Sequence, residues 1–487
     1  MSTATMAKPN VQAAATPDFI QEIDRIFALQ KEHRWNVAKT TADERIAKLK
    51  SIVAYVYDNR EKLHRALYDD FQKPSVEADI GDVMPVLGEA KHAIKNLKKW
   101  MKPQRVRKTI TMASTKAWIR YEPKGVALII APWNYPFNLT YGPLVSAIAA
   151  GNCAMIKPSE LTPHTSTFIR EMTAALFPEE EVAVFEGDKD VSAALLKKPF
   201  DHIFFTGSPQ VGKIVMKAAA EHLSSVTLEL GGKSPTIVDE TADLEDAAQK
   251  IAWSKFANCG QTCIAPDYLM VHASKYDAFM DAFKMAVKSS YGENDETWKD
   301  SGDYPRIVNN SHFRRIKSII DDTLEKGAQL ELGGKAIPDD NYISPTLISK
   351  PAMDSEAMQQ EIFGPVLPAM PYASLEKDVI SVINEKEKPL ALYIFSKSQE
   401  NIEKVLSNTS AGGTCINDVM VNYSHLNMPF GGVNNSGIGK SHGWYGFLAF
   451  SNERGVLKHH KYSALKNLYP PYTGKVKKMV DFLVKYT

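Results

Sequence analysis

The chain has 487 residues, of which 44% are hydrophobic and 24% charged, so it can bury a large core divided among two or three domains. Its 58 basic and 57 acidic residues nearly cancel, which excludes an overall field that would attract nucleic acid or anionic membranes. We therefore expect small molecules and further copies of the chain as partners.

The cysteine content indicates a reducing compartment, and we expect a cytoplasmic protein. The four cysteines are too few for a disulfide framework, and no CxxC pair or Cys/His cluster has the spacing of a zinc site, so we predict no metal. They are Cys153, Cys259, Cys263 and Cys415.

The chain begins with a segment that does not look like a secretory signal. Residues 1–16 lack a basic start and a continuous apolar run, and we interpret them as a flexible tail. Residues 17–101 then place apolar side chains at three- and four-residue spacing, as at Leu49, Ile52 and Val56. This pattern predicts an all-helical entry to the first domain.

One stretch, residues 125–156, carries no charge and has the length of a membrane span. Pro132, Pro136 and Pro143 interrupt it, and we expect them to divide it into pieces too short to cross a bilayer. We interpret the stretch as a buried strand followed by a buried helix.

From residue 126 onward, short apolar runs alternate with helical patterns, which indicates βαβ units and a parallel sheet covered on both faces. The predicted strands span 126–131, 154–156, 182–185, 202–205 and 226–230, and the predicted helices span 144–150, 166–175, 191–196 and 211–220. A second alternating region starts near Thr236, with predicted elements at 269–272, 276–287, 390–395 and 413–416. The sequence thus predicts an α/β fold with two parallel-sheet domains.

Two segments are candidates for binding a dinucleotide. The turn that contains Gly207, Ser208 and Gly212 joins a strand to a helix, where backbone N–H groups can meet a pyrophosphate. Its glycine spacing is not GxGxxG, so an ordinary strand-to-helix turn is favoured on local grounds. Lys157 and Glu160 follow another strand and could bind ribose hydroxyls, but a solvated charge pair fits their pattern equally well.

Three residues have the chemistry of a covalent catalyst. Glu229 lies inside an apolar segment, where burial would raise its pKa and suit it to general-base work, unless it faces solvent on an edge strand. Cys263 could form a thiolate adduct with an aldehyde, although a buried structural cysteine is the commoner case. The amide of Asn134 could donate to the oxyanion of that adduct, and an aromatic loop that only packs is the alternative.

Together, the order and spacing of seven motifs resemble the aldehyde dehydrogenase superfamily over residues 19–458. These motifs are Pro132-Trp133-Asn134-Tyr135-Pro136, Lys157-Pro158-Ser159-Glu160, Phe205-Thr206-Gly207-Ser208, Leu228-Glu229-Leu230-Gly231-Gly232-Lys233, Gly260-Gln261-Thr262-Cys263, Glu361-Ile362-Phe363-Gly364-Pro365 and Pro429-Phe430-Gly431-Gly432. The likeness extends to the short, dimeric class 3 branch, which acts on fatty and aromatic aldehydes, through residues 261–268, 435–447 and 469–472.

The resemblance implies a division of the chain into functional parts. Residues 17–230 would form a cofactor domain of the Rossmann-like type, and residues 231–417 a catalytic domain. Residues 102–124 and 418–460 would supply a small β-rich oligomerisation arm for a homodimer, and residues 461–487 a C-terminal tail.

The resemblance also assigns roles to single residues. Cys263 would be the nucleophile, Glu229 the base that activates water, and Asn134 with the backbone N–H of Cys263 the oxyanion hole. NAD, with NADP as the alternative, would be held by Trp133, Lys157, Glu160, Gly207, Ser208, Gly212, Glu361 and Phe363. Tyr135 and Phe430 would form an apolar entrance for the substrate.

These assignments predict a hydrolytic aldehyde dehydrogenase that converts aldehydes to carboxylic acids. A coenzyme A-acylating dehydrogenase is an alternative that Glu229 argues against, because a thiol acceptor needs no activated water. A non-catalytic protein with the same fold is a second alternative, and the presence of Cys263, Glu229 and Asn134 together argues against it. Cys259 lacks the motif position, so we expect it to be dispensable.

Some class 3 relatives carry a hydrophobic membrane tail at the C-terminus. In this chain Lys477, Lys478, Asp481 and Lys485 interrupt the last stretch, which predicts a short amphipathic helix instead. Peripheral contact of this basic end with a membrane is a minor alternative to a free tail.

Overall fold

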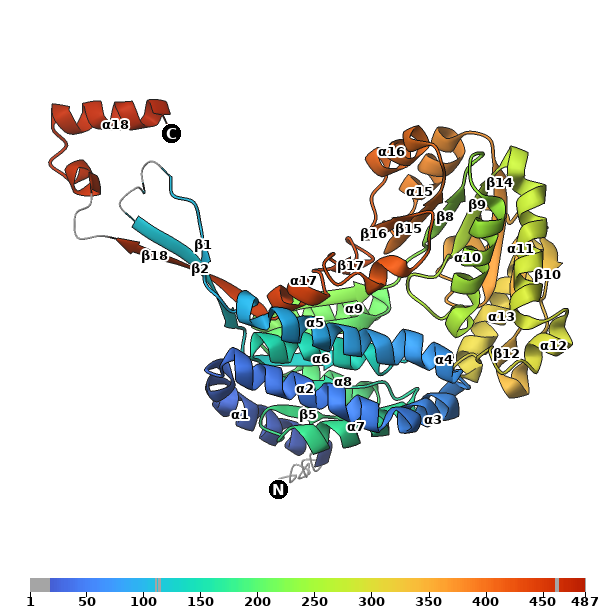
Figure 1. The fold of residues 1–487 in the computed structure, drawn as a ribbon, viewed down its shortest axis with the longest axis horizontal. Helices are drawn as coiled ribbons and strands as arrows, with labels where there is room; N and C mark the ends of the chain where they lie inside the picture. The colour runs from blue at the N-terminus through green and yellow to red at the C-terminus, as the bar shows by residue number, and fades with distance from the viewer. Residues whose placement is uncertain (1–17, 110–111, 113–114, 460–463, 487) are drawn as a thin grey trace, which may run out of the picture.

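The computed structural model describes residues 18–109, 112, 115–459 and 464–486. Two α/β bodies lie against each other, and a long arm projects from the first of them (Figure 1). The flexible tail predicted for residues 1–16 lies outside the described residues.

The predicted helical entry is present as a layer of helices over the first body. It comprises α1 (Asp18–Ala38), α2 (Ala42–Asp58), α3 (Arg60–Phe71), α4 (Ser75–Ala78), the π-helical turn η1 (Asp79–Val83) and α5 (Met84–Trp100). The start of α2 is fixed by a capping box, in which Thr41 and Glu44 each bond the other's backbone N–H. Leu49, Ile52 and Val56 are buried on one face of α2, as their spacing predicts.

The first sheet has six strands in the order β17-β7-β6-β3-β4-β5 and is parallel except for β17. Its strands are β3 (Val126–Ile130), β4 (Cys153–Lys157), β5 (Val182–Val184), β6 (His202–Gly207), β7 (Ser225–Leu230) and β17 (Gly437–Ile438). The connecting helices are α6 (Asn138–Ala150), α7 (Pro163–Leu176), α8 (Lys189–Leu196) and α9 (Pro209–His222). The chain runs outward from β3 in both directions, and such a reversal is where open α/β sheets place ligands.

The uncharged stretch contains β3, a loop, α6 and the start of β4, which confirms a buried strand followed by a buried helix. The predicted break at Pro143 is wrong, because this proline lies inside α6. Loss of one backbone hydrogen bond there is tolerated because nearly every side chain of α6 is buried among its neighbours. Across the described ranges, no helix is both long and apolar enough to cross a membrane.

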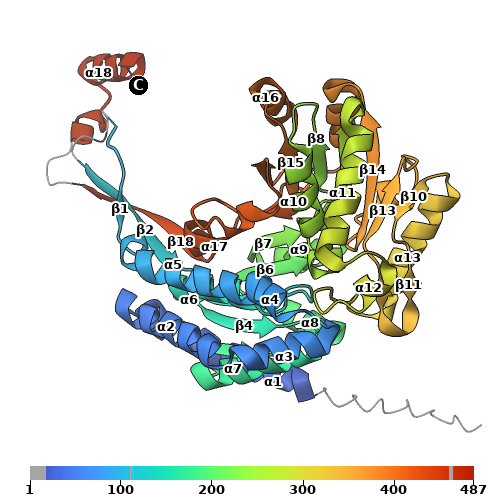
Figure 2. The ribbon, with the colours of Figure 1, turned by 45° about the vertical axis from the view of Figure 1, so that its right-hand side comes forward.

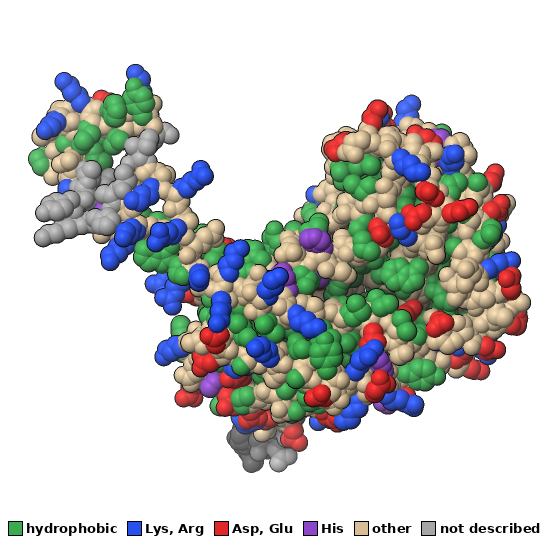
Figure 3. Space-filling model, viewed as in Figure 1, with side chains coloured by type: hydrophobic (Ala, Val, Ile, Leu, Met, Phe, Trp, Pro, Cys, Tyr) green, Lys and Arg blue, Asp and Glu red, His purple; other side chains and the backbone are tan. Residues whose placement is uncertain are grey.

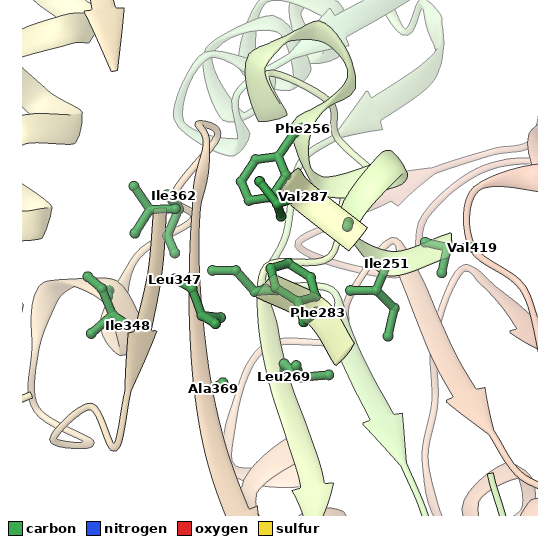
Figure 4. Close-up of a cluster of buried hydrophobic side chains, with 14 of the residues drawn as sticks. Ile251, Phe256, Leu269, Phe283, Val287, Leu347, Ile348, Ile362, Ala369 and Val419 are labelled. Carbon is green, nitrogen blue, oxygen red and sulfur yellow. The ribbon is translucent and has the colours of Figure 1, made fainter. Parts of the chain in front are cut away.

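The second sheet has seven strands in the order β10-β13-β14-β9-β8-β15-β16, and only β10 is antiparallel. The strands are β8 (Pro235–Val238), β9 (Tyr268–His272), β10 (Gln329–Leu332), β13 (Thr346–Ser349), β14 (Val366–Tyr372), β15 (Ala391–Phe395) and β16 (Gly413–Ile416). The main helices are α10 (Leu244–Phe256), α11 (Tyr276–Tyr291), α13 (Asn310–Glu325) and α16 (Gln399–Asn408). A buried core of residues such as Phe256, Leu269 and Phe283 joins α10 and α11 to this sheet (Figure 4).

Short elements complete the second body. They are α12 (Asp295–Lys299), β11 (Ala336–Ile337), β12 (Tyr342–Ile343), α14 (Glu356–Gln359) and α15 (Ser381–Glu385).

The arm is a three-stranded sheet of β1 (Gln104–Arg105), β2 (Thr115–Pro123) and β18 (Ser451–His459). Nine residue pairs join β2 to β18, and α17 (Gly443–Ala449) leads the chain into β18. Beyond the arm lies α18 (Gly474–Tyr486), at the position of the predicted amphipathic helix and away from both bodies (Figures 1 and 2). Lys and Arg side chains follow the arm over much of its length (Figure 3).

Candidate active site

Cys263 is partly buried and follows a strained loop at the end of α10. Asn258, Cys259 and Gly260 are all left-handed, with φ of 53°, 54° and 70°. A Cβ on Gly260 would lie 2.3 Å from the Gly364 carbonyl oxygen, so only glycine fits there. Such strain is held by the surroundings and is typical of functional sites.

The side chain of Gln261 holds this loop in place. Its amide donates to the carbonyls of Asn258 and Arg306, at 3.0 and 3.1 Å, and its oxygen accepts from Val308 N–H at 3.0 Å. Burial, with the nearby carboxylates of Glu361 and Glu229, raises the pKa of the Cys263 thiol to about 12. The thiol is therefore protonated at neutral pH and needs a base to become a nucleophile.

Glu229 lies on β7, which is paired on both sides by β6 and β17. The alternative of an exposed edge-strand carboxylate is therefore wrong. Ser441 Oγ donates to Glu229 Oε1 at 2.9 Å, and Oε2 has no hydrogen-bond partner among the described residues. Burial raises the pKa of Glu229 to about 8, against the smaller opposing effects of Ser441 and Lys440.

Asn134 follows β3 and reaches the loop that carries Cys263. Its side-chain Nδ2 donates to the Gln261 carbonyl at 2.9 Å, and its backbone carbonyl accepts from Asn258 Nδ2 at 2.9 Å. A side-chain amide has two N–H groups, and the described contact uses one of them. The structure thus brings this sequence-predicted residue directly against the cysteine loop.

A pocket of about 140 Å³ begins at Cys263 and lies between α5 and α10, where hydrophobic side chains gather on the surface (Figure 3). Its wall is largely apolar and includes Ile80, Pro85, Tyr135, Leu139, Trp253, Ala257, Ile264, Met420, Val421 and Tyr423. Most of these residues escaped sequence reasoning, because they come from segments far apart in the chain and no spacing relates them.

The two residues predicted to contact substrate differ in position. Tyr135 lines the pocket, and its hydroxyl bonds Thr262 Oγ1 at 2.8 Å. Phe430 does not line the pocket, because its ring packs against Tyr423 and His442 with centroid distances of 5.0 Å. Phe430 therefore supports Tyr423, which forms the wall.

The first group of predicted cofactor residues lies at the carboxyl ends of β4 and β6. Lys157 is buried and donates to Glu160 Oε2 at 2.5 Å, so a simple solvated pair does not describe it. Gly207 ends β6 and Ser208 caps α9, where Ser208 Oγ accepts from Val211 N–H at 3.4 Å as an ordinary helix cap would. Gly212 is packed so closely that a Cβ would lie 2.7 Å from Leu230.

The second group lies nearer the thiol. Glu361 Oε1 accepts from Gly232 N–H at 3.1 Å, and burial with the charge of Asp267 raises its pKa to about 7. The rings of Trp133 and Phe363 meet edge to face at 5.4 Å. The structure thus brings Trp133 and Phe363 together from two separate motifs, and the Glu361 carboxylate is close enough to affect the Cys263 thiol.

Arg315 of α13 was missed by sequence reasoning. Its guanidinium donates to the Ile362 carbonyl at 2.8 Å and so fixes the loop between Glu361 and Phe363. A single arginine on an amphipathic helix matches no motif, so the sequence does not indicate that Arg315 holds this loop.

Comparisons with known proteins agree with this architecture. Residues 10–456 match the model of the Aldehyde dehydrogenase family. A putative aldehyde dehydrogenase, AldX, of Bacillus subtilis is 46% identical over 436 residues, which are 90% of this chain and 97% of that protein. Aldehyde dehydrogenase family 3 member A2 of rat is 41% identical, over 91% of this chain and 90% of that protein.

Solved structures give the same result. The substrate-bound Staphylococcus aureus AldH has a TM-score of 0.90 and 40% identity, over 95% of this chain and 99% of that one. An NAD⁺ complex of a Bacillus cereus aldehyde dehydrogenase has a TM-score of 0.83 and 27% identity, over 91% of this chain and 89% of that one. The fold and these matches define an α/β oxidoreductase. The chain belongs to the aldehyde dehydrogenase family, with class 3 members among its relatives.

Replacement of Glu229 by glutamine should stabilise the fold as the pH rises. The raised pKa means that the folded state binds this proton more tightly than the unfolded state, so wild-type stability falls between pH 4.5 and about 8. Glu229→Gln removes this loss, and we expect a gain of roughly 1–3 kcal/mol near pH 8. Thermal melts from pH 5 to 9 measure it, with exposed Glu171→Gln as the control. An identical pH dependence in Glu229→Gln and wild type would contradict the burial argument.

Proposed function

We propose that the protein oxidises apolar aldehydes to carboxylic acids with NAD(P)⁺ and water, through a covalent intermediate on Cys263. The observation that supports this most directly is the proximity of a carboxyl and an amide to a thiol that lines the pocket. Cys263 lines the pocket, Asn134 bonds the cysteine loop, and the Glu229 carboxyl interacts electrostatically with the thiol.

In this mechanism the ionised form of Glu229 accepts the Cys263 proton on its unpaired Oε2, directly or through a water. The sulfur then adds to the carbonyl carbon, and the oxygen that becomes negative accepts hydrogen bonds from Asn134 Nδ2 and the Cys263 backbone N–H. This tetrahedral adduct has a carbon-bound hydride that the free aldehyde cannot donate.

A nicotinamide ring, when bound, supplies the hydride acceptor for that adduct. After oxidation the acyl group is held on Cys263 as a thioester. Glu229 first releases to solvent the proton that it took from Cys263, and then removes a proton from water. The hydroxide adds to the acyl carbon, and the sulfur leaves as a thiolate, which Glu229 reprotonates. The balance is aldehyde, NAD(P)⁺ and water to carboxylic acid, NAD(P)H and a proton.

The residues at the sheet edge fit a dinucleotide. Lys157 and Glu160 offer a donor and an acceptor for ribose hydroxyls at the end of β4. The N-terminus of α9 would face the phosphates, and Thr206 Oγ1 at the end of β6 is buried without a partner in the described part of the chain. Val211 and Ile214 are exposed on the same helix and suit the face of a base. Glu361 would bind the second ribose, and Trp133 and Phe363 would border the nicotinamide ring.

We further propose a homodimer formed through the arm. Within the described residues the outer strand β18 pairs only with β2, on one edge, and most of its nine residues are exposed. A long free strand edge is normally covered, and a second copy of the arm would cover it. Four free cysteines are consistent with our proposal of a cytoplasmic location.

Replacement of the nucleophile should abolish turnover, whereas replacement of a neighbouring cysteine should leave turnover nearly unchanged. We expect Cys263→Ala to lower aldehyde-dependent NADH formation by at least about 10³-fold, because no covalent adduct forms. Cys259→Ala is the matched control, since this thiol is buried four positions earlier and contacts Tyr304 instead of the pocket. Substantial activity in Cys263→Ala, with normal cofactor binding, would refute the mechanism.

The pocket should favour apolar substrates. We expect kcat/KM to rise several-fold for each added methylene from butanal to octanal, because each buried CH₂ contributes about 0.8 kcal/mol. Benzaldehyde and cinnamaldehyde should also be used, as the name of a 40% identical relative, the probable coniferyl aldehyde dehydrogenase of Pseudomonas aeruginosa, suggests. Leu139→Asn in the pocket wall should make kcat/KM less dependent on the chain length of the aldehyde. Met285→Asn, at an exposed position of α11, should not change this dependence. A preference for small charged aldehydes would overturn this assignment.

The carboxylate of Glu160 should disfavour NADP. Its negative charge would face the 2′-phosphate, so we expect Glu160→Gln to raise the NADP/NAD ratio of kcat/KM by about tenfold. Initial rates with both cofactors measure the ratio. An unchanged ratio would show that Glu160 turns away from the ribose or that charge repulsion is not limiting.

A further inference from the structure

A fully buried ion pair lies outside every motif described above. Lys73 Nζ and Asp82 Oδ2 are 2.8 Å apart, and both side chains have an exposed fraction of 0%. Lys73 follows α3, and Asp82 lies in the π-helical turn η1. A π-turn inside a helical segment often marks a functional position.

The Lys73 ammonium contacts the loop that carries the predicted oxyanion donor. It donates to the backbone carbonyl of Asn134 at 3.1 Å and lies 4.2 Å from the ring centre of Tyr135. The same Asn134 carbonyl also accepts from Asn258 Nδ2. Two donors from different parts of the chain therefore fix the orientation of this peptide.

Asp82 holds the other end of the same loop. Its Oδ1 accepts from the backbone N–H groups of Phe137 and Asn138, at 3.2 and 3.1 Å, where α6 begins. A carboxylate at a helix N-terminus also interacts favourably with the helix dipole. Lys73 and Asp82 thus hold residues 134 and 137–138 at once, through one ion pair.

Stability alone is a weak reason for such a pair. Removing two charges from water costs about as much as their attraction returns, and apolar substitutes are often as stable. The contacts of this pair are instead concentrated on the loop whose amide must meet a developing charge. Oxyanion stabilisation depends on donors already placed at the right distance, so a loss of placement reduces the rate.

We propose that Lys73 and Asp82 are positioning residues, which orient the Asn134 amide toward the oxygen of the Cys263 adduct. This inference rests on the proposed function, in which Asn134 is the oxyanion donor. Neither residue touches the substrate. Their effect on catalysis therefore passes through Asn134.

A double-mutant cycle tests this route. Full-length wild type, Lys73→Met, Asn134→Ala and the double variant are assayed for kcat and KM with octanal and NAD⁺. We expect Asn134→Ala to lower kcat about 100-fold and Lys73→Met about tenfold, with KM for both substrates nearly unchanged. In the Asn134→Ala background, Lys73→Met should cause no further loss, because the donor it orients is already absent.

Arg45→Met provides a matched control. Arg45 is also a buried cation against α6, but it donates to the Ala149 carbonyl at the opposite end of that helix, at 3.0 Å. Any effect of Arg45→Met on kcat should be the same with and without Asn134. If the effects of Lys73→Met and Arg45→Met on kcat both simply add to the effect of Asn134→Ala, Lys73 acts only on the fold. That result would overturn the proposal.

A second variant covers the case in which Lys73→Met does not fold. Asp82→Asn keeps an acceptor for the α6 N–H groups and removes one charge, and we expect the same non-additive loss of kcat. A folded Lys73→Met or Asp82→Asn enzyme with wild-type kcat would also overturn the proposal. An Asn134→Ala enzyme with wild-type kcat would instead refute the oxyanion assignment itself, whatever Lys73 does.

Discussion

The hydrogen bonds around the Asn134 peptide join the two halves of the molecule at the point where chemistry is proposed to occur. The loop after β3 belongs to the first sheet, and the loop that ends at Cys263 belongs to the second body. Asn134 Nδ2 bonds the Gln261 carbonyl, and Asn258 Nδ2 bonds the Asn134 carbonyl in return. Because both bonds are buried, they are protected from competition with water, and the separation of thiol and amide is fixed.

Burial has a second consequence, which is that it favours the protonated forms of the titratable groups of the site. The pKa of Glu229 is raised to about 8 and that of Glu361 to about 7, while the Cys263 thiol is raised to about 12. A base and a nucleophile that are both protonated cost the fold less than two ionised groups would. In the proposed mechanism Glu229 must therefore lose its own proton before it can accept the one from Cys263, so the first proton transfer depends on the ionisation of Glu229.

Much of the fold follows from simple patterns, and the exceptions have physical causes. The five parallel strands of the first sheet contain short apolar runs, so their positions could be predicted, whereas the two-residue strand β17 gives no such signal. The sequence analysis predicts no strand between residues 288 and 389, where Pro368 and Pro371 would each deprive a strand of a backbone donor. Both prolines nevertheless lie in β14, which is central between β13 and β9. Pro143 inside α6 is the same kind of case, since dense packing compensates for a missing backbone donor.

The site shows a similar division between motif and surroundings. Cys263, Glu229 and Asn134 could be found because each lies in a short distinctive sequence. Lys73 could not, because a lysine in an amphipathic helical region looks like a solvated residue, and only the tertiary structure brings it to Asn134 from 61 positions away. Trp253 and Tyr423 reach the pocket from equally unrelated segments. In the mechanism that we propose, the motifs therefore determine which reaction is chemically available, whereas residues with no motif determine where the reacting groups are held and which aldehydes reach them.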